Sequence, residues 1–279
     1  MYPYLKINDF QIPFYWIFMM IGIISSIVVL YLINRTKKIL ESQDLLYSIL
    51  FGICGGILGA KIMYLITSIP IMIEDPKKIL PLIFEGGLVF YGGLIFGVIA
   101  IMYYIKSYGL NPVKILDLFA IVLPLGHAFG RVGCFMAGCC YGLKTDKWYG
   151  VYFKYSVDES IRFTKVVPIQ IIEAIFLIVI FVILLIAYFK FYKPFIIIKL
   201  YLFLYGVLRF IIEFFRGDDY RGIAILSTSQ WISLICILTS ILLWIPAINK
   251  LKFLHEEEPY NKKYLIYKKE NDSYGTKTK

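Results

Sequence analysis

The sequence predicts an all-α polytopic membrane protein with seven transmembrane helices and a small extracytoplasmic loop region. Of its 279 residues, 59% are hydrophobic and only 17% are charged, against about 25% charged in a typical soluble domain. Apolar runs of membrane-spanning length recur along the chain, and an aromatic share of 18% suits interfacial belts of tyrosine and tryptophan. The net charge of +10 indicates lysine-rich loops near anionic lipid heads, so a bilayer and not nucleic acid is the expected partner.

Seven apolar runs are counted as membrane spans, with about 20 residues expected for one crossing. They cover residues 14–33, 45–66, 88–105, 114–129, 168–188, 195–215 and 227–248. Residues 1–248 are therefore expected to form one membrane domain, followed by a lysine-rich cytoplasmic tail at 249–279. No small-residue cleavage site follows the first run, so we expect it to remain in place as a helix.

Small residues and prolines justify several of these elements. The second span contains Gly55, Gly59 and Ala60, which favour close helix packing. Pro168 opens the fifth span, because proline suits the first turn of a helix. Between spans four and five, residues 143–167 are polar and rich in tyrosine, and the alternation in YGVYFKYSV predicts a short strand pair outside the membrane.

Basic residues near helix ends set the expected orientation. They follow spans one, three, five and seven, and they include Arg35, Lys37, Lys38, Lys106, Lys190, Lys193, Lys250 and Lys252. Because positively charged loops stay in the cytoplasm, we expect the N-terminus outside and the C-terminus inside.

The stretch from Leu125 to Gly142 carries the densest chemistry. It contains one arginine, Arg131, with three of the five cysteines and five glycines. We expect the fourth span to end near Phe129 and the rest to form a glycine-rich turn that lines a polar pocket at membrane depth. An arginine at that depth is costly and usually has an anionic partner.

Arg131 and Arg209 are predicted at the outer ends of spans four and six, with Arg216 two helical turns beyond Arg209. Converging guanidinium groups suit a phosphate, because the planar fork donates in pairs. The alternatives are that Arg209 pairs with Glu213 at i, i+4 and that Arg131 extends to the surface.

Two polar residues, Gln170 and Glu173, share one face at the start of span five. The carboxylate of Glu173 could orient an arginine, accept a proton, or simply neutralise Arg131. Tyr15 and Trp16 fit an aromatic belt, whereas the glycines around Tyr91 suggest a side chain presented to a cavity.

Cys134, Cys139 and Cys140 leave several chemistries open: a disulfide, a nucleophile, or small packing residues. Their spacing lacks the paired CxxC motifs and histidines of a zinc site, so no metal is expected. Cys54 and Cys236 lie inside apolar runs, where a buried small hydrophobe is the ordinary role.

Taken together, these motifs resemble the prolipoprotein diacylglyceryl transferase family. The matching pieces are GGILGAK, GGLVFYGGLIFG, GRVGCFMAGCCYG, VVPIQIIE, YGVLRFIIEFFR and STSQWISL. The resemblance implies an enzyme of the bacterial plasma (inner) membrane that moves the diacylglyceryl group of phosphatidylglycerol onto the lipobox cysteine of a prolipoprotein, releasing glycerol phosphate. It implies no metal and no organic cofactor.

The resemblance also suggests roles for single residues. Arg131 matches the arginine that binds the head group, Arg209 and Glu213 match a pair that gates or orients substrate, and Gly142 ends the signature. The expected catalytic residues are Arg131, Arg209, Tyr91 and Glu213. The expected substrate-binding residues are Arg131, Tyr15, Gly142, Glu173, Gln170, Lys61, Cys134 and Tyr205.

The chain departs from the family signature GRxGNFxNGExxG at three positions, where Cys134, Ala137 and Cys139 replace its two asparagines and its glutamate. Two departures lie outside that signature: Tyr91 stands in place of a histidine, and Lys61 in place of an arginine. A phenol is a poor base at neutral pH, so either a strong base is not essential or the chemistry has diverged. A different acceptor, with Cys134 or Cys139 as a covalent relay, and a non-catalytic lipid transporter are the competing hypotheses.

Overall fold

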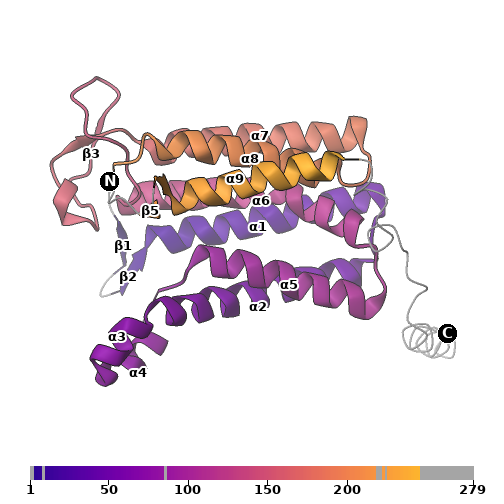
Figure 1. Cartoon of the computed structure of the whole chain (residues 1–279), viewed down its shortest axis with the longest axis horizontal. Coiled ribbons are helices and arrows are strands. Elements are labelled where there is room, and N and C mark those ends of the chain that lie inside the picture. Colours follow the sequence, from indigo (N-terminus) through magenta and orange to yellow (C-terminus); the bar gives the residue numbers. More distant parts are fainter. Residues whose placement is uncertain (1–2, 8–9, 85–86, 218–221, 224, 246–279) are drawn as a thin grey trace. The chain divides into compact units, whose positions relative to one another are not determined.

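The computed structural model describes residues 3–7, 10–84, 87–217, 222–223 and 225–245 (Figure 1). These residues fall into two compact units, one within Met1–Ile33 and Val113–Leu254 and the other within Asn34–Pro112. The predicted cytoplasmic tail at 249–279 lies outside the described residues, as does most of the charged loop after Arg216.

Helices dominate the described part of the chain, as predicted. Five of them are long and apolar enough to cross a membrane: α1 (Phe14–Lys37), α2 (Ser42–Thr67), α5 (Phe90–Tyr108), α6 (Pro112–Ala137) and α7 (Ile169–Phe191). The last two helices are α8 (Ile196–Glu213), which has three charged residues, and α9 (Thr228–Trp244), a shorter apolar helix. An all-α polytopic membrane protein is confirmed, while the count of seven spans stays a prediction.

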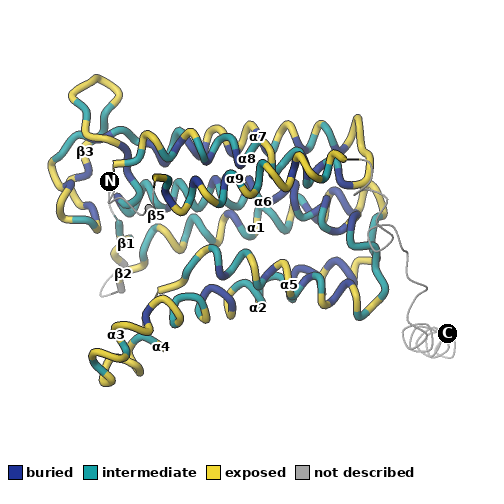
Figure 2. Tube along the Cα trace, in the orientation of Figure 1, coloured by how far each residue is buried: buried dark blue, intermediate teal, exposed yellow. Residues whose placement is uncertain are grey.

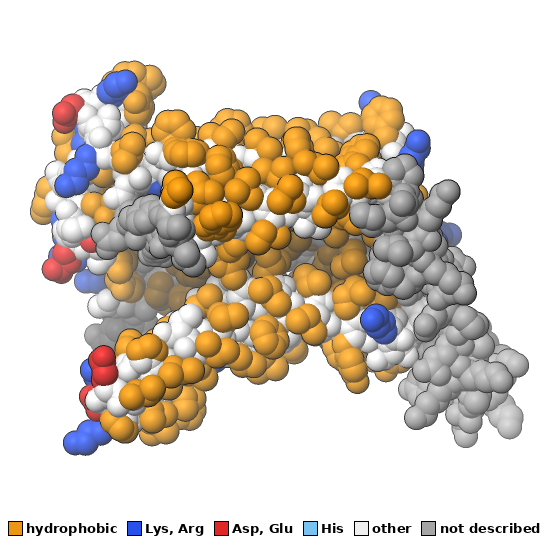
Figure 3. Space-filling view, viewed as in Figure 1, with side chains coloured by type: hydrophobic (Ala, Val, Ile, Leu, Met, Phe, Trp, Pro, Cys, Tyr) orange, Lys and Arg blue, Asp and Glu red, His pale blue; other side chains and the backbone are white. Residues whose placement is uncertain are grey.

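The first unit contains α1, α6, α7, α8 and α9, whose axes run along one common direction (Figure 1). Helix α6 lies deepest, with Ile115, Leu118 and Ile121 fully buried. Exposed positions recur along α7 (Figure 2), and they include the apolar residues Ile175, Val179 and Ile186. Figure 3 shows hydrophobic side chains covering the lengths of α7 and α9, with charged side chains gathered near the helix ends. This distribution suits helices whose outer faces contact lipid.

Glycines let two helix pairs of this unit approach closely. A Cβ atom on Gly22 of α1 would lie 3.0 Å from Cβ of Phe129 and 3.1 Å from the carbonyl oxygen of Gly126, both on α6. On α8, a Cβ on Gly206 would lie 3.0 Å from the carbonyl oxygen of Ser233 on α9. Small residues at such crossings are typical of membrane helices.

The predicted end of the fourth span near Phe129 is wrong. Helix α6 continues to Ala137 with Pro124 inside it, because a membrane helix tolerates an internal proline when its neighbours and local adjustments satisfy the freed backbone groups. The chain reverses only at Gly138, whose φ of 76° suits glycine. Arg131 therefore lies on a helix and not in a glycine-rich turn.

The second unit is built on the packing of α2 against α5. A Cβ atom on Gly55 would lie 2.5 Å from Cβ of Ala100, and one on Gly59 would overlap Phe96. The predicted packing role of these small residues is confirmed. Two short helices, α3 (Ile69–Glu74) and α4 (Ile79–Phe84), follow α2 and are joined by the 3₁₀ turn η1 (Pro76–Lys78).

The loop between α6 and α7 has a small hydrophobic core of its own. Strand β3 (Val151–Tyr152) pairs antiparallel with β4 (Lys165–Val166), so a short strand pair is present in this loop, and its second strand follows the alternating stretch. Its location outside the membrane stays a prediction. The core of the loop consists of Tyr141, Phe153, Ile161 and Val166, with Phe135 packed against them. The loop also contains the 3₁₀ turn η2 (Glu159–Ile161).

Two further hairpins lie elsewhere in the chain. One pairs β1 (Tyr4–Ile7) with β2 (Phe10–Pro13), and the other pairs β5 (Gly222–Ile223) with β6 (Leu226–Ser227).

Candidate active site

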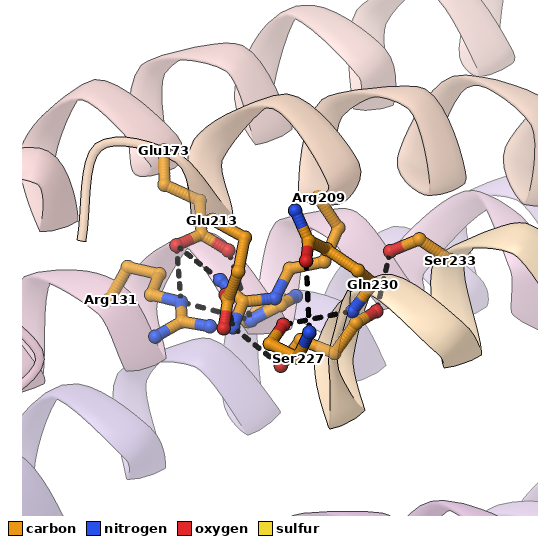
Figure 4. Close-up of polar contacts among 9 residues, drawn as sticks. Arg131, Glu173, Arg209, Glu213, Ser227, Gln230 and Ser233 are labelled. Atoms are coloured by element: carbon orange, nitrogen blue, oxygen red, sulfur yellow. Dashed lines mark hydrogen bonds and ion pairs between the residues drawn. The ribbon is translucent and has the colours of Figure 1, made fainter. Parts of the chain in front are cut away.

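A buried cluster of charged side chains joins α6, α7 and α8 (Figure 4). Glu173 of α7 is at its centre and is 2% exposed. Its Oε2 atom lies 3.0 Å from Nε of Arg131 and 3.7 Å from Nη1 of Arg209. One carboxylate oxygen therefore serves two arginines that are 78 residues apart in the chain.

Arg131 is held on both sides of its Nε atom. Besides the contact with Glu173, Nε donates to Nε2 of His127 at 3.2 Å. His127 lies one helical turn earlier on α6, and an Nε2 atom that accepts this bond carries no proton. Both contacts engage Nε, so neither of them uses the two terminal nitrogens of the guanidinium fork.

Arg209 is the most buried of the basic groups in the cluster. Its Nη2 atom lies 2.8 Å from Oε2 of Glu213, one turn further along α8, and donates to Oγ of Ser229 at 2.9 Å. The predicted Arg209–Glu213 pair is therefore present, and Arg209 also reaches Glu173. The ion pair with Glu213 therefore does not take Arg209 out of the cluster, and its role in the site stays a prediction.

The first turn of α9 brings Ser229 to Arg209. Ser227 begins the helix with a capping box: its Oγ accepts from the backbone N–H of Gln230, and Oε1 of Gln230 accepts from the backbone N–H of Ser227 (Figure 4). Such a box fixes the start of a helix. Ser233 donates to the carbonyl oxygen of Ser229 at 2.8 Å, a bond within α9 itself. The capping box of Ser227 and Gln230 therefore defines the position of this turn.

Several polar atoms of the cluster are buried without a hydrogen-bond partner among the described residues. They include Oε1 of Glu173, Nη1 of Arg209 and Oε1 of Gln170. Buried polar atoms of native proteins are nearly always satisfied. Unsatisfied donors and acceptors beside two guanidinium groups are what a polar ligand would complete.

Gln170 and Gly142 hold the chain segment that follows α6. Gln170, fully buried on α7, donates from Nε2 to the carbonyl oxygen of Cys139 at 2.7 Å. Gly142 donates from its N–H to the carbonyl oxygen of Val167 at 3.0 Å. A Cβ atom on Gly142 would lie 2.8 Å from that oxygen and 3.0 Å from the carbonyl oxygen of Phe215. Both predicted site residues therefore shape the backbone next to the cluster.

The three clustered cysteines lie on this segment and on the last turn of α6. They are free thiols with Sγ atoms within 4.8 Å of one another. Hydrogen bonds from Cys134 and Cys139 lower the pKa of the Cys140 thiol against the effect of burial, and the positive charge of Arg131 lowers it further. The same hydrogen bonding raises the pKa of Cys139.

Tyr15 and Tyr205 border this region from α1 and α8. A Cβ atom on Gly133 of α6 would lie 3.2 Å from Cα of Tyr15, so the start of α1 packs directly on the signature stretch. The ring of Tyr205 lies 5.6 Å from that of His127. Tyr205 also packs on the core beneath the cluster, which consists of Ala128, Ala174 and Leu177.

Lys61 and Tyr91 belong to the second unit. Lys61 donates from Nζ to the carbonyl oxygen of Leu82 at 3.0 Å and lies over the ring of Tyr64. Tyr91, at the start of α5, is half-buried and makes an edge contact with Phe90. Their predicted roles in substrate binding and catalysis stay predictions.

Two side chains of the cluster were not among the residues predicted for the site. His127 precedes Arg131 by four residues, and this helical spacing on an apolar helix was the available signal. Ser229 lies inside the STSQWISL motif, but nothing in its local sequence indicates a contact with Arg209. A buried carboxylate outside this cluster, that of Asp117 on α6, accepts from the backbone N–H groups of Phe195 and Ile198 at 2.9 and 3.0 Å. It therefore caps the start of α8.

Comparisons with known proteins agree with this arrangement of motifs. A family model described as prolipoprotein diacylglyceryl transferase matches residues 3–246. The phosphatidylglycerol–prolipoprotein diacylglyceryl transferase of Clostridium tetani is 38% identical over 224 residues, which cover 79% of this chain and 87% of that protein.

Two further relatives have the same kind of name. The second such transferase of Clostridium perfringens is 33% identical over 232 residues, covering 83% of this chain and 89% of the relative. The enzyme of Wolbachia pipientis is 29% identical over 258 residues, covering 88% and 94%. Similarity therefore extends over nearly the whole chain, and the chain belongs to the prolipoprotein diacylglyceryl transferase family.

Proposed function

We propose that this protein transfers the diacylglyceryl group of phosphatidylglycerol to the lipobox cysteine thiol of a prolipoprotein. In this reaction the thiol sulfur forms a bond to the glyceryl carbon that carries the phosphate. The bond between that carbon and the phosphate oxygen breaks, glycerol phosphate leaves with the electron pair, and the thiol proton is released.

The buried Arg131–Glu173–Arg209 arrangement carries this proposal. The leaving group is a phosphate monoester, and stabilising its charge is the largest contribution a site can make to such a reaction. Glu173 holds Nε of Arg131 at 3.0 Å, which orients the guanidinium plane while the terminal nitrogens remain for a phosphate. Paired donation by a planar fork is the arrangement in which arginine binds phosphate best.

The proton and the nucleophile require little from the protein. A cysteine thiol is already a few per cent thiolate at neutral pH, so a modest acceptor is enough. His127 is uncharged when it accepts from Arg131, and in this proposal it keeps that arginine in place. Tyr91, as a phenol, donates a hydrogen bond to substrate and does not act as the base.

For the membrane arrangement we propose that α8 and α9 also cross the bilayer, giving seven spans in the bacterial inner membrane. Basic residues in the last turns of α1, α5 and α7 support an outer N-terminus and a cytoplasmic C-terminus. Residues 249–279 then form the cytoplasmic tail. Reporter fusions at residue 150 and after residue 245 test this: an active periplasmic reporter at the second position would contradict it.

Complementation tests the reaction. A strain depleted of its own diacylglyceryl transferase is supplied with the wild-type chain or with Arg131→Ala, and membrane levels of both proteins are compared. Rescue by the wild type alone is the expected result. If neither rescues while both reach the membrane, a different acceptor or a transport role replaces this proposal.

A second comparison addresses the covalent-relay alternative. Cys134→Ser removes a nucleophile but keeps a small polar group beside Arg131. We expect a partial loss of transfer from phosphatidylglycerol to a lipobox peptide, with glycerol phosphate still released. Complete loss, together with normal phospholipid binding, would favour a relay through Cys134.

A further inference from the structure

The second half of the signature stretch forms a compact group of three sulfur atoms. Cys134 lies in the last turn of α6, and Cys139 and Cys140 follow directly after the reversal at Gly138. Their three Sγ atoms lie within 4.8 Å of one another and are partly buried. The spacing of these cysteines along the chain predicted no metal site, but the fold makes the three thiols neighbours.

The backbone takes the left-handed conformation twice to bring the sulfurs together, at Gly138, where it is ordinary, and at Cys140, where it is uncommon. Gly138 and Cys140 have φ values of 76° and 58°, and a non-glycine residue in the left-handed region costs about 1 kcal/mol. Both N–H groups that follow the helix, those of Gly138 and Cys139, donate to the carbonyl oxygen of Cys134 at 3.0 and 3.2 Å. The chain therefore folds Cys139 and Cys140 back over Cys134. Local strain of this kind points to a function for the group.

Contacts from outside the segment keep the group in place. Gln170 donates to the carbonyl oxygen of Cys139 at 2.7 Å, and Ser156 donates from Oγ to that of Gly138 at 2.8 Å. The N–H of Val157 donates to the carbonyl oxygen of Ala137 at 3.0 Å. The thiols are thus held by α7 and by the folded loop, so their proximity does not depend on the segment alone.

We propose that Cys134, Cys139 and Cys140 bind one thiophilic metal ion of the Zn²⁺ class. Zinc–sulfur bonds of about 2.3 Å place neighbouring sulfurs about 3.8 Å apart, so small side-chain rotations from the present spacing suffice. On binding, three S–H groups release three protons and three S–Zn bonds form, which leaves a fourth position for water. The resulting complex has a charge of about −1 by this proton count, and the neighbouring guanidinium of Arg131 balances it.

This chemistry needs no partner beyond the metal, in contrast to a disulfide. A disulfide would join only two of the three sulfurs, at about 2.05 Å, and would require an oxidant. Metal binding can be measured without substrate, so it is independent of the proposed transferase reaction.

The test uses the purified full-length chain in detergent, with a Strep-tag, reduced with a phosphine and stripped of metal. Zn²⁺ is titrated against a chromophoric chelator, and Cd²⁺ is used to record sulfur-to-metal charge transfer. We expect one tight equivalent, weakened at least about 100-fold in Cys134→Ser, Cys139→Ser and Cys140→Ser, because even residues outside the ligand shell account for 10–100-fold.

Cys54→Ser and Cys236→Ser are the matched controls, since both residues are free thiols elsewhere in the chain. The double variant with both changes retains only the three clustered cysteines, and it should bind one Cd²⁺ with undiminished charge-transfer intensity. Thermal unfolding of each variant shows whether weaker metal binding comes from the missing sulfur ligand or from a failure to fold.

Two results would overturn the proposal. One is a reduced wild-type chain that binds Zn²⁺ no more tightly than the variant lacking all three clustered cysteines. The other is a charge-transfer signal that survives the three single substitutions but disappears in Cys54→Ser or Cys236→Ser.

Discussion

Arg131 and Glu173 contact each other at 3.0 Å between Nε and Oε2, inside the first unit and almost out of contact with solvent. The contact joins the end of α6 to the beginning of α7 across a loop of more than thirty residues. Removing one partner of a buried ion pair leaves the other charge without compensation, and this costs more than the pair contributes as a whole. Substitutions of the two residues are therefore expected to have non-additive effects on the free energy of unfolding. Their effects on the rate of transfer are expected to differ.

Replacing Arg131 with lysine separates charge from geometry. Arg131→Lys keeps a cation opposite Glu173 but lacks the planar fork that binds phosphate in pairs. We expect kcat/KM for transfer to a lipobox peptide to fall about 100-fold, by analogy with the loss of one donor from an anion site. Arg35→Lys, at an exposed position in the last turn of α1, is the control. Activity of Arg131→Lys within twofold of wild type would refute the fork argument.

Glu173→Gln tests the structural role of the shared carboxylate. Two buried arginines then lose their common partner, and we expect a loss of about 3–5 kcal/mol in unfolding free energy. Arg131→Gln in the same chain should restore part of that stability, because it removes the uncompensated charge, without restoring transfer. Thermal unfolding in detergent and a transfer assay measure the two effects. If the unfolding free energy lost in the double variant equals the sum of the losses in the two single variants, the residues are not coupled.

Ser229→Ala removes one hydrogen-bond partner of Arg209 while Glu213 and Glu173 remain. A hydrogen bond to a charged group contributes about 1.5–3 kcal/mol, so we expect about a tenfold or larger fall in kcat/KM with little change in membrane abundance. Ser233→Ala, one turn further along α9, is the matched control and should retain activity. Identical effects of the two changes would remove Ser229 from the site.

Gly142→Ala should be poorly tolerated for reasons of space. The new Cβ would press on the carbonyl oxygens of Val167 and Phe215 at 2.8 and 3.0 Å, so the backbone must shift and weaken the hydrogen bonds beside the cluster. We expect a lower unfolding temperature than for Gly130→Ala, where nothing lies within 4 Å of the added atom. Gly130→Ala should be neutral or stabilising by up to about 1 kcal/mol, because alanine favours a helix. The reverse order of unfolding temperatures would contradict this packing argument.

Asp117→Ala should destabilise the protein without touching the site. Asp117 accepts from two backbone N–H groups at the start of α8, and each buried donor left unsatisfied costs about 1–3 kcal/mol. Asp117→Asn keeps one accepting oxygen and should lose less. Asp146→Ala, on an exposed loop, is the comparison for thermal unfolding. Equal unfolding temperatures for Asp117→Ala and Asp146→Ala would exclude the cap.

Much of the fold could be predicted from local patterns. Hydrophobic length located the helices to within a few residues at most of their ends, because the bilayer requires about 20 apolar residues wherever a helix crosses it. Alternation located the strand at Val151–Tyr152. The glycines of the second span identified its packing against α5, since close helix approach demands small residues at regular spacing.

The sequence by itself determined the membrane class, the approximate helix positions and the family resemblance, and it singled out Arg131, Arg209 and Glu173 as candidate site residues. Only the tertiary structure decided that α6 continues to Ala137, that His127 and Ser229 hold the two arginines, and that three sulfurs meet after the helix. Hydropathy and spacing are properties of a short segment, and a segment carries them wherever it lies. Which side chains face one another depends on the rotation and packing of helices far apart in the chain, and that is settled only when they assemble.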